Sequence, residues 1–157
     1  MNEGLLLSVI LMSLLLIKHY LFDFVFQGPY QHLNKGTYGH PGGLLHTGLH
    51  LLGTALVLLG FQVIGWWGLP TFSGPLDAQF NLYVLSAPWK FIGLILLVEG
   101  LIHYHADWLK VNINRINDWH SSKDPEFWWL MGLDQLTHQM TYIVITFWYL
   151  SHLKYWI

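Results

Sequence analysis

The sequence predicts an all-α membrane protein whose four transmembrane helices form an up-down bundle within a single domain, residues 1–157. Hydrophobic residues make up 54% of the chain and Asp, Glu, Lys and Arg only 10%, whereas about a quarter of a typical soluble domain is charged. So few charges would not cover a surface exposed to water, which indicates that much of the surface faces lipid. Four apolar segments also reach the roughly 20 residues that a helix needs to cross a bilayer. They are residues 4–26, 42–64, 88–109 and 127–150.

Helix-breaking residues separate these segments. The first segment is followed by Gly28-Pro29, and Pro41 lies just before the second. Residues 65–88 are rich in proline, glycine and tryptophan, as expected of a connection at the membrane interface.

A polar stretch, residues 110–126, connects the third and fourth segments. Its apolar residues are spaced for a short amphipathic helix on the membrane surface. They are Val111, Ile113, Ile116 and Trp119. The sequence Asp124-Pro125-Glu126 is typical of a first helical turn, so we expect the fourth helix to begin there.

Charge and cysteine content exclude several classes of function. The net charge is -2 and there is no basic stripe to neutralise phosphates, so a nucleic-acid partner is not expected. The chain has no cysteine, which excludes disulfides, thiolate metal sites and a cysteine nucleophile. Ten histidines, in contrast, are many for so apolar a chain, and they require an explanation.

Basic residues predict the orientation of the bundle. Four spans place both termini on one side, where two basic residues lie, and the two connections on the opposite side hold four. The four are Lys35, Lys110, Arg115 and Lys123, and the two are Lys90 and Lys154. Because loops rich in lysine and arginine stay in the cytoplasm, we expect both termini on the outer side.

Each predicted helix carries two potential metal ligands four residues apart. Four residues advance about 6 Å along a helix and return to nearly the same face, so both side chains can address one centre. The pairs lie near the ends of the first and third helices and near the starts of the second and fourth. Up-down connectivity therefore brings all of them to a similar depth, in the cytoplasmic half. They are His19 and Asp23, His46 and His50, His103 and Asp107, and Asp134 and His138.

Imidazole and carboxylate groups on facing helices indicate a divalent metal, zinc or iron. Eight candidates exceed the three or four ligands of one zinc, so either two ions bind or some residues orient the ligands of one. Glu99, one turn before His103, is predicted to be a general base or a bridging ligand. Lys110, at the cytoplasmic rim, is predicted to bind an anionic headgroup or a phosphate. Side-chain amides are expected to hold neighbouring ligands, and these are Gln27, Gln135 and Gln139.

Other readings of the same residues stay open. The polar groups could form an interhelical network without metal or a proton path, and a haem site is a further alternative. Lys18 could snorkel toward the interface or pair with a carboxylate. His105 lies on another helix face and is expected to be peripheral. The tryptophans are expected to form belts at the two membrane interfaces.

Short motifs follow one another in a characteristic order along the chain. They are His19-x3-Asp23-Phe24-x2-Gln27, Lys35, His46-x3-His50, His103-x3-Asp107-x2-Lys110 and Asp134-Gln135-x2-His138. Together they resemble the small bacterial and phage membrane proteins catalogued as domain of unknown function 3307. The resemblance covers nearly the whole chain and implies a multi-pass protein of the bacterial inner membrane, without an established reaction. A looser similarity, by analogy, runs to membrane-bound metal-dependent hydrolases.

The leading functional hypothesis is a metal-dependent hydrolase acting on a lipid or another membrane-associated phosphoester at the cytoplasmic leaflet. The depth of the site near the headgroups indicates such a substrate, and a bound ion would activate water. A di-iron or copper redox protein is the second hypothesis, because the same residue types suit redox metals. The third is a non-enzymatic structural or accessory subunit of a larger membrane complex.

Overall fold

The computed structural model describes residues 3–66 and 89–154, and all secondary structure in these two ranges is helical, as predicted. The elements are α1 (Glu3–Tyr20), η1 (Leu21–Val25), α2 (Pro29–His32), α3 (Pro41–Trp66), α5 (Trp89–Asn117) and α6 (Pro125–Lys154). Each of the four long helices overlaps one predicted apolar segment, with η1 continuing the first segment and α5 extending to Asn117, beyond the predicted end of the third. Most of the predicted interfacial connection, residues 67–88, lies outside the described residues.

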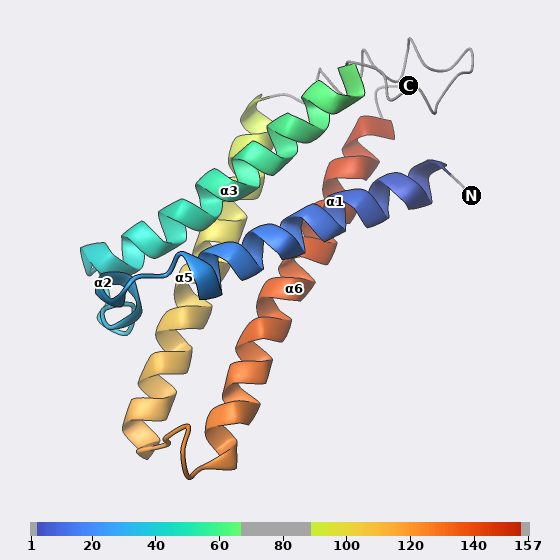
Figure 1. Ribbon diagram of the computed structural model, residues 1–157. Coiled ribbons are helices and arrows are strands. Elements are labelled where there is room, and N and C mark those ends of the chain that lie inside the picture. Colours follow the sequence, from blue (N-terminus) through green and yellow to red (C-terminus); the bar gives the residue numbers. More distant parts are fainter. Residues whose placement is uncertain (1–2, 67–88, 155–157) are drawn as a thin grey trace.

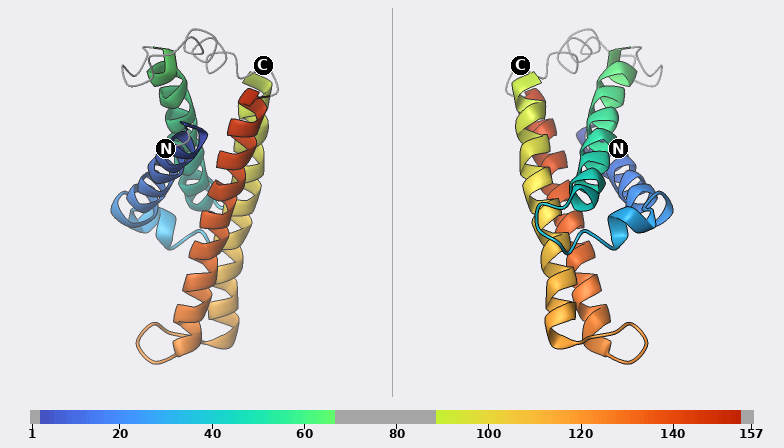
Figure 2. Two further views of the ribbon diagram at one scale, coloured as in Figure 1. Left: turned by 90° about the vertical axis from the view of Figure 1, so that its right-hand side faces the viewer. Right: turned by 90° about the vertical axis from the view of Figure 1, so that its left-hand side faces the viewer.

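The long helices pack in a closed order, since α1 contacts α3 and α6, and α5 also contacts α3 and α6. Figure 1 shows the N-terminal end of α1 on the same side as the C-terminal end of α6. The helices α5 and α6 form a long hairpin whose lower end extends beyond α1 and α3 (Figure 2). The helices α1 and α3 therefore pack against the upper part of this hairpin.

Three of the described helical stretches are long and apolar enough to cross a membrane. They are Leu5–Val25, Pro41–Gln62 and Trp89–Asn117. The helix α6 is 30 residues long, but its glutamines, threonines and histidines make it more polar, and it is not among the three. Large apolar side chains are exposed on the outer faces of all four helices, as in Leu56 and Phe147.

A hydrophobic core fills the half of the assembly away from the α5–α6 turn. Leu11, Leu15, Leu58, Ile95 and Tyr149 have no exposed surface. The helix α3 lies close to α1 and η1 at Gly53, where a Cβ atom would be 2.6 Å from the Phe22 ring and 2.8 Å from the Lys18 side chain. Lys18 can therefore enter the space between the helices.

The prediction of a separate amphipathic helix within residues 110–126 is wrong. Residues 110–117 contain neither proline nor glycine, so α5 continues through them to Asn117. The helix ends at Asp118, which has a left-handed backbone conformation with φ 55°. Only the residues that follow, up to Pro125, form the turn.

The first predicted segment contains a feature that its apolar pattern does not indicate. α1 passes into the π-helical turn η1, in which the Phe26 N–H donates to the Leu21 carbonyl over 2.8 Å. Turns of this kind are rare in proteins as a whole, and those that occur are often at functional sites. Asp23 lies inside this turn and is buried.

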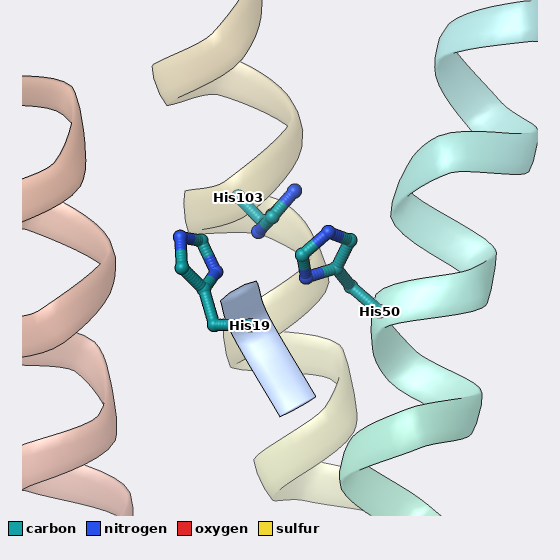
Figure 3. Close-up of side chains that lie close together, drawn as sticks. All are labelled: His19, His50 and His103. Carbon is teal, nitrogen blue, oxygen red and sulfur yellow. The ribbon is translucent and has the colours of Figure 1, made fainter. Parts of the chain in front are cut away.

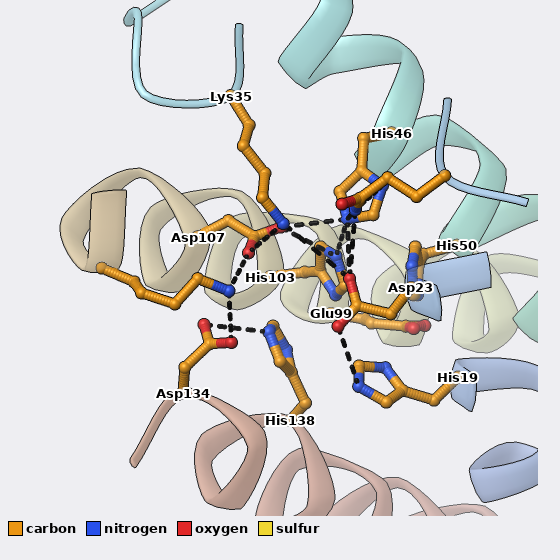
Figure 4. A network of polar contacts seen from close by, with 12 residues as sticks. His19, Asp23, Lys35, His46, His50, Glu99, His103, Asp107, Asp134 and His138 are labelled. Carbon is orange, nitrogen blue, oxygen red and sulfur yellow. Dashed lines mark hydrogen bonds and ion pairs between the residues drawn. The ribbon is translucent and has the colours of Figure 1, made fainter. Parts of the chain in front are cut away.

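The connection between η1 and α3 packs onto α5. The Asn112 amide donates to the Gly36 carbonyl over 2.8 Å, and the Gly39 N–H donates to the Tyr104 hydroxyl over 2.6 Å. This connection carries Lys35, which is only 5% exposed and points into the centre of the assembly (Figure 4).

Candidate metal centre

The structure brings the eight predicted ligands together in one buried cluster, to which all four long helices and η1 contribute (Figure 4). Each of these side chains belongs to at least one group of three whose ligand atoms lie within 4.8 Å of one another. The predicted convergence of the helix pairs is therefore observed. Their role as ligands stays a prediction. The residues are His19, Asp23, His46, His50, His103, Asp107, Asp134 and His138.

One of these groups has the dimensions of a tetrahedral metal site. His46 Nε2 lies 3.2 Å from His103 Nε2 and 3.0 Å from Asp107 Oδ2, and the last two atoms are 3.5 Å apart. Ligands about 2.0 Å from a tetrahedral zinc are about 3.3 Å from one another. The three side chains could accept such an ion with little movement.

Asp23 lies beside this group. Its Oδ1 is 3.4 Å from His46 Nε2, so the carboxylate could supply a fourth ligand or face a water in the fourth position. The Gln27 amide nitrogen contacts both Asp23 Oδ1, at 3.2 Å, and His46 Nδ1, at 3.1 Å. Gln27 therefore holds two candidate ligands in place, as expected from the sequence.

Two lysines determine which oxygen of Asp107 faces the imidazoles. Lys35 Nζ donates to Asp107 Oδ1 over 2.9 Å, and Lys110 Nζ donates to the same oxygen over 3.0 Å. The other oxygen, Oδ2, is thereby directed at His46 and His103. Because charge-assisted hydrogen bonds are stronger than neutral ones, the lysines fix the orientation of this carboxylate.

Lys110 is also the link to α6. Its Nζ donates to Asp134 Oδ2 over 2.6 Å, while Asp134 Oδ1 lies 3.4 Å from His138 Nε2. The ammonium group thus occupies the position between two carboxylates that a metal ion could also take. Its predicted role in binding a phosphate stays a prediction.

Glu99 belongs to a second polar group on the side of the hydrophobic core. Its Oε1 accepts hydrogen bonds from Lys18, over 3.0 Å, and from Thr54, over 2.8 Å. Lys18 also donates to the Tyr142 hydroxyl over 2.9 Å, and this hydroxyl lies 3.2 Å from His19 Nδ1. Lys18 therefore pairs with a carboxylate, which is one of the two alternatives that the sequence left open.

Charges in the cluster nearly balance without an ion. Three buried ammonium groups (Lys18, Lys35 and Lys110) face four buried carboxylates (Asp23, Glu99, Asp107 and Asp134). With neutral imidazoles the cluster has one net negative charge. A divalent ion with a bound hydroxide would restore neutrality.

Two members of the polar cluster are absent from the sequence prediction. Thr54 follows His50, and Tyr142 follows His138, by four residues each. Extending the spacing of the pairs by one more turn would have indicated both. Conversely, Gln139 was expected to support the site, but its side chain is exposed. It lies about 100° around the helix from His138 and faces outward.

No protein-family model, curated protein or solved structure matches this chain. The geometry and chemistry of the cluster are therefore the basis for a functional proposal.

Proposed function

We propose that the chain is an integral membrane metalloprotein that binds a divalent ion at His46, His103 and Asp107 and hydrolyses a membrane-associated phosphoester. The ligand-to-ligand distances of 3.0, 3.2 and 3.5 Å carry this proposal, because they match the edges of a tetrahedral zinc site. The three residues come from α3 and α5, which lie side by side, so the site is built on rigid elements.

The ligand set supports hydrolysis. Two imidazoles and one carboxylate, with a further position for water, are the ligands of hydrolytic zinc centres, whereas structural zinc sites are closed by four protein ligands. A zinc ion bound there would make water a nucleophile at neutral pH. Asp23, 3.4 Å from His46 Nε2, is placed to orient that water. Glu99 Oε2, which has no hydrogen-bond partner in the described part of the chain, is the predicted base.

The membrane setting is part of the proposal. We take α6 as a fourth span, so that the chain forms an up-down bundle in the bacterial inner membrane with both termini in the periplasm. The outward exposure of Leu133, Leu136, Met140 and Val144 on α6 supports lipid contact despite its polar inner face. A lipid phosphoester of the cytoplasmic leaflet is then the substrate nearest to the site. The proposed resemblance to domain of unknown function 3307 agrees with this setting.

Two observations favour other functions. Two histidines and one carboxylate also form the ligand set of non-haem iron oxygenases, so a redox protein is the second candidate. The near balance of buried ammonium and carboxylate groups favours a metal-free polar network in an accessory subunit of a membrane complex. The identity of the bound metal separates these functions, since zinc supports hydrolysis and not oxygen chemistry.

The test is metal analysis of the purified chain in detergent, together with hydrolysis of phosphatidic acid in mixed micelles. We expect at least one zinc per chain, unchanged in His105→Ala and reduced by one in His46→Ala and Asp107→Asn. His105 is a matched control because it lies on the same helix as Asp107 but contacts Tyr38 outside the cluster. Iron in place of zinc would favour the redox function. A folded chain without any metal would overturn the proposal in favour of the network.

A further inference from the structure

Buried nitrogen atoms without partners gather on one side of the proposed ion. His50 has no exposed surface, and neither of its ring nitrogens has a hydrogen-bond partner in the described part of the chain. The same is true of Nδ1 of His103, a residue that is 1% exposed. Most buried polar groups in proteins are hydrogen-bonded, so several unpaired nitrogens in one place indicate a ligand that they would share.

These nitrogens belong to a group of three imidazoles from three helices. His19 comes from α1, His50 from α3 and His103 from α5, and Figure 3 shows their rings around a common space. The ring centroids of His50 and His103 are 4.0 Å apart, and those of His19 and His50 are 5.3 Å apart. Each ring offers a ligand atom within 4.8 Å of the others. Three imidazoles form a known ligand set for zinc.

A second ion in the cluster would have to share a ligand with the first. Each of the other three groups able to hold an ion contains one of His46, His103 and Asp107. The shared residue must therefore offer a second donor atom. On Asp107 that atom, Oδ1, already accepts hydrogen bonds from two lysines. On His46 it is Nδ1, which the Gln27 amide contacts at 3.1 Å.

His103 is the remaining shared residue, and its Nδ1 is unpaired. We infer that His103 bridges two ions, with Nε2 on the ion at His46 and Asp107 and Nδ1 on a second ion held by His19 and His50. This inference rests on the proposed function for the first ion. The bridging ring gives up its N–H proton to the medium when the second ion binds.

The surroundings provide charge and support for this second ion. Glu99 lies beside His103 and His138, its Oε2 is also unpaired in the described part of the chain, and Lys18 donates to its other oxygen. Gln135 Oε1 lies 3.0 Å from His19 Nε2 and keeps that ring in orientation. The contact of His19 Nδ1 with the Tyr142 hydroxyl, at 3.2 Å, can be exchanged for the ion.

Copper(II) is a suitable probe because two copper ions on one imidazole couple magnetically. The full chain would be purified in detergent, freed of metal with a chelator, and titrated with copper(II). The expected result is about two coppers per chain, with an electron paramagnetic resonance signal far weaker than two isolated coppers would give. His50→Gln should bind about one copper with a full signal. Asp107→Asn should also give a full, uncoupled signal, because the first ion loses its only carboxylate ligand from α5.

Each contrary outcome identifies what fails. One copper per chain, unchanged by His50→Gln, would overturn the second ion and leave the proposed function intact. Two coppers with a full signal would overturn the bridge. No bound copper in a chain that elutes as a folded species would overturn the proposed function itself. Circular dichroism and size-exclusion profiles identical to those of the parent chain establish that each variant is folded.

Discussion

The Asp107 carboxylate of α5 lies 3.0 Å from the His46 imidazole of α3, from Oδ2 to Nε2. The opposite oxygen of the same carboxylate accepts hydrogen bonds from Lys35 and Lys110. One residue thus joins the candidate metal site to the cations that neutralise it. In a low-dielectric interior, removal of the Asp107 carboxylate should therefore weaken metal binding and also lower the free energy of unfolding.

Replacing Asp107 by asparagine should abolish metal binding at the site formed with His46 and His103 and destabilise the fold. An amide is a poor ligand, and the two lysines would lose the carboxylate that they share. Breaking a buried ion pair from one side costs about 3–5 kcal/mol. Metal content and thermal unfolding in detergent measure the two effects. The control is Asp118→Asn, whose carboxylate is 81% exposed and should change neither quantity. A metal content in Asp107→Asn equal to that of the parent chain would exclude this residue as a ligand.

The Lys110–Asp134 pair should behave as a structural unit rather than as a metal ligand pair. Lys110→Met leaves Asp134 without its cation and Asp107 with Lys35 alone, and we expect a loss of about 3–5 kcal/mol in the free energy of unfolding. The double variant Lys110→Met/Asp134→Leu removes the unpaired charge on α6 and should recover part of that loss. Both variants should keep the ion at His46 and His103. If both variants are as stable as the parent chain, the 2.6 Å contact contributes little to stability.

Glu99→Gln separates the role of a base from that of a ligand. The amide keeps the size of the side chain, so metal at the first site should be retained. Hydrolysis should fall by about 100-fold or more, which is the usual contribution of a general base. The control is Glu126→Gln, which lies in the first turn of α6 and is not a member of the polar cluster. Unchanged hydrolysis in Glu99→Gln would assign the carboxylate a structural role as the partner of Lys18.

The fold was predictable where apolar length and helix breakers act locally. Gly28-Pro29 and Pro125 mark helix boundaries that the structure reproduces, and the spacing of four residues placed the ligand pairs on inner faces. The prediction failed over residues 110–117. Their polarity predicts the end of a membrane span. A polar stretch without proline or glycine can nevertheless continue as a helix, as α5 does here. Helix continuation depends on backbone hydrogen bonds and not on what surrounds the helix.

The candidate site was predictable as a set of residues and not as a set of contacts. Nothing in the sequence tells which oxygen of Asp107 faces Lys35, or that Lys110 lies between two carboxylates. These contacts depend on how the turn after α2 and the helix α6 pack against α5, which is a tertiary property. The π turn at Asp23 could not be predicted from the sequence either, because the apolar residues around Asp23 also fit the pattern of an α-helix.

Gly53 should tolerate no larger side chain, because of what lies against it. A Cβ atom there would press on the Phe22 ring and on the aliphatic part of Lys18, so Gly53→Val should displace Lys18 from Glu99. We expect a loss of about 1–3 kcal/mol from overpacking. Gly48→Val is the matched control, since it lies on the same helix with nothing within 4 Å of its Cβ position. Equal stability of the two variants would show that α1 and α3 can separate at this crossing without cost.

The topology of α6 decides whether the chain has four spans, and the absence of cysteine allows a clean test. One variant carries Ser121→Cys, at an exposed position in the turn between α5 and α6, and the other carries a cysteine appended after Ile157. With four spans and the proposed orientation, a membrane-impermeant maleimide added to spheroplasts should label the C-terminal cysteine and not Ser121→Cys. Both should react once the membrane is permeabilised. The reverse pattern would invert the orientation and keep the architecture. Labelling of both sites in intact spheroplasts would place the two ends of α6 on one side, and the chain would then not have four spans.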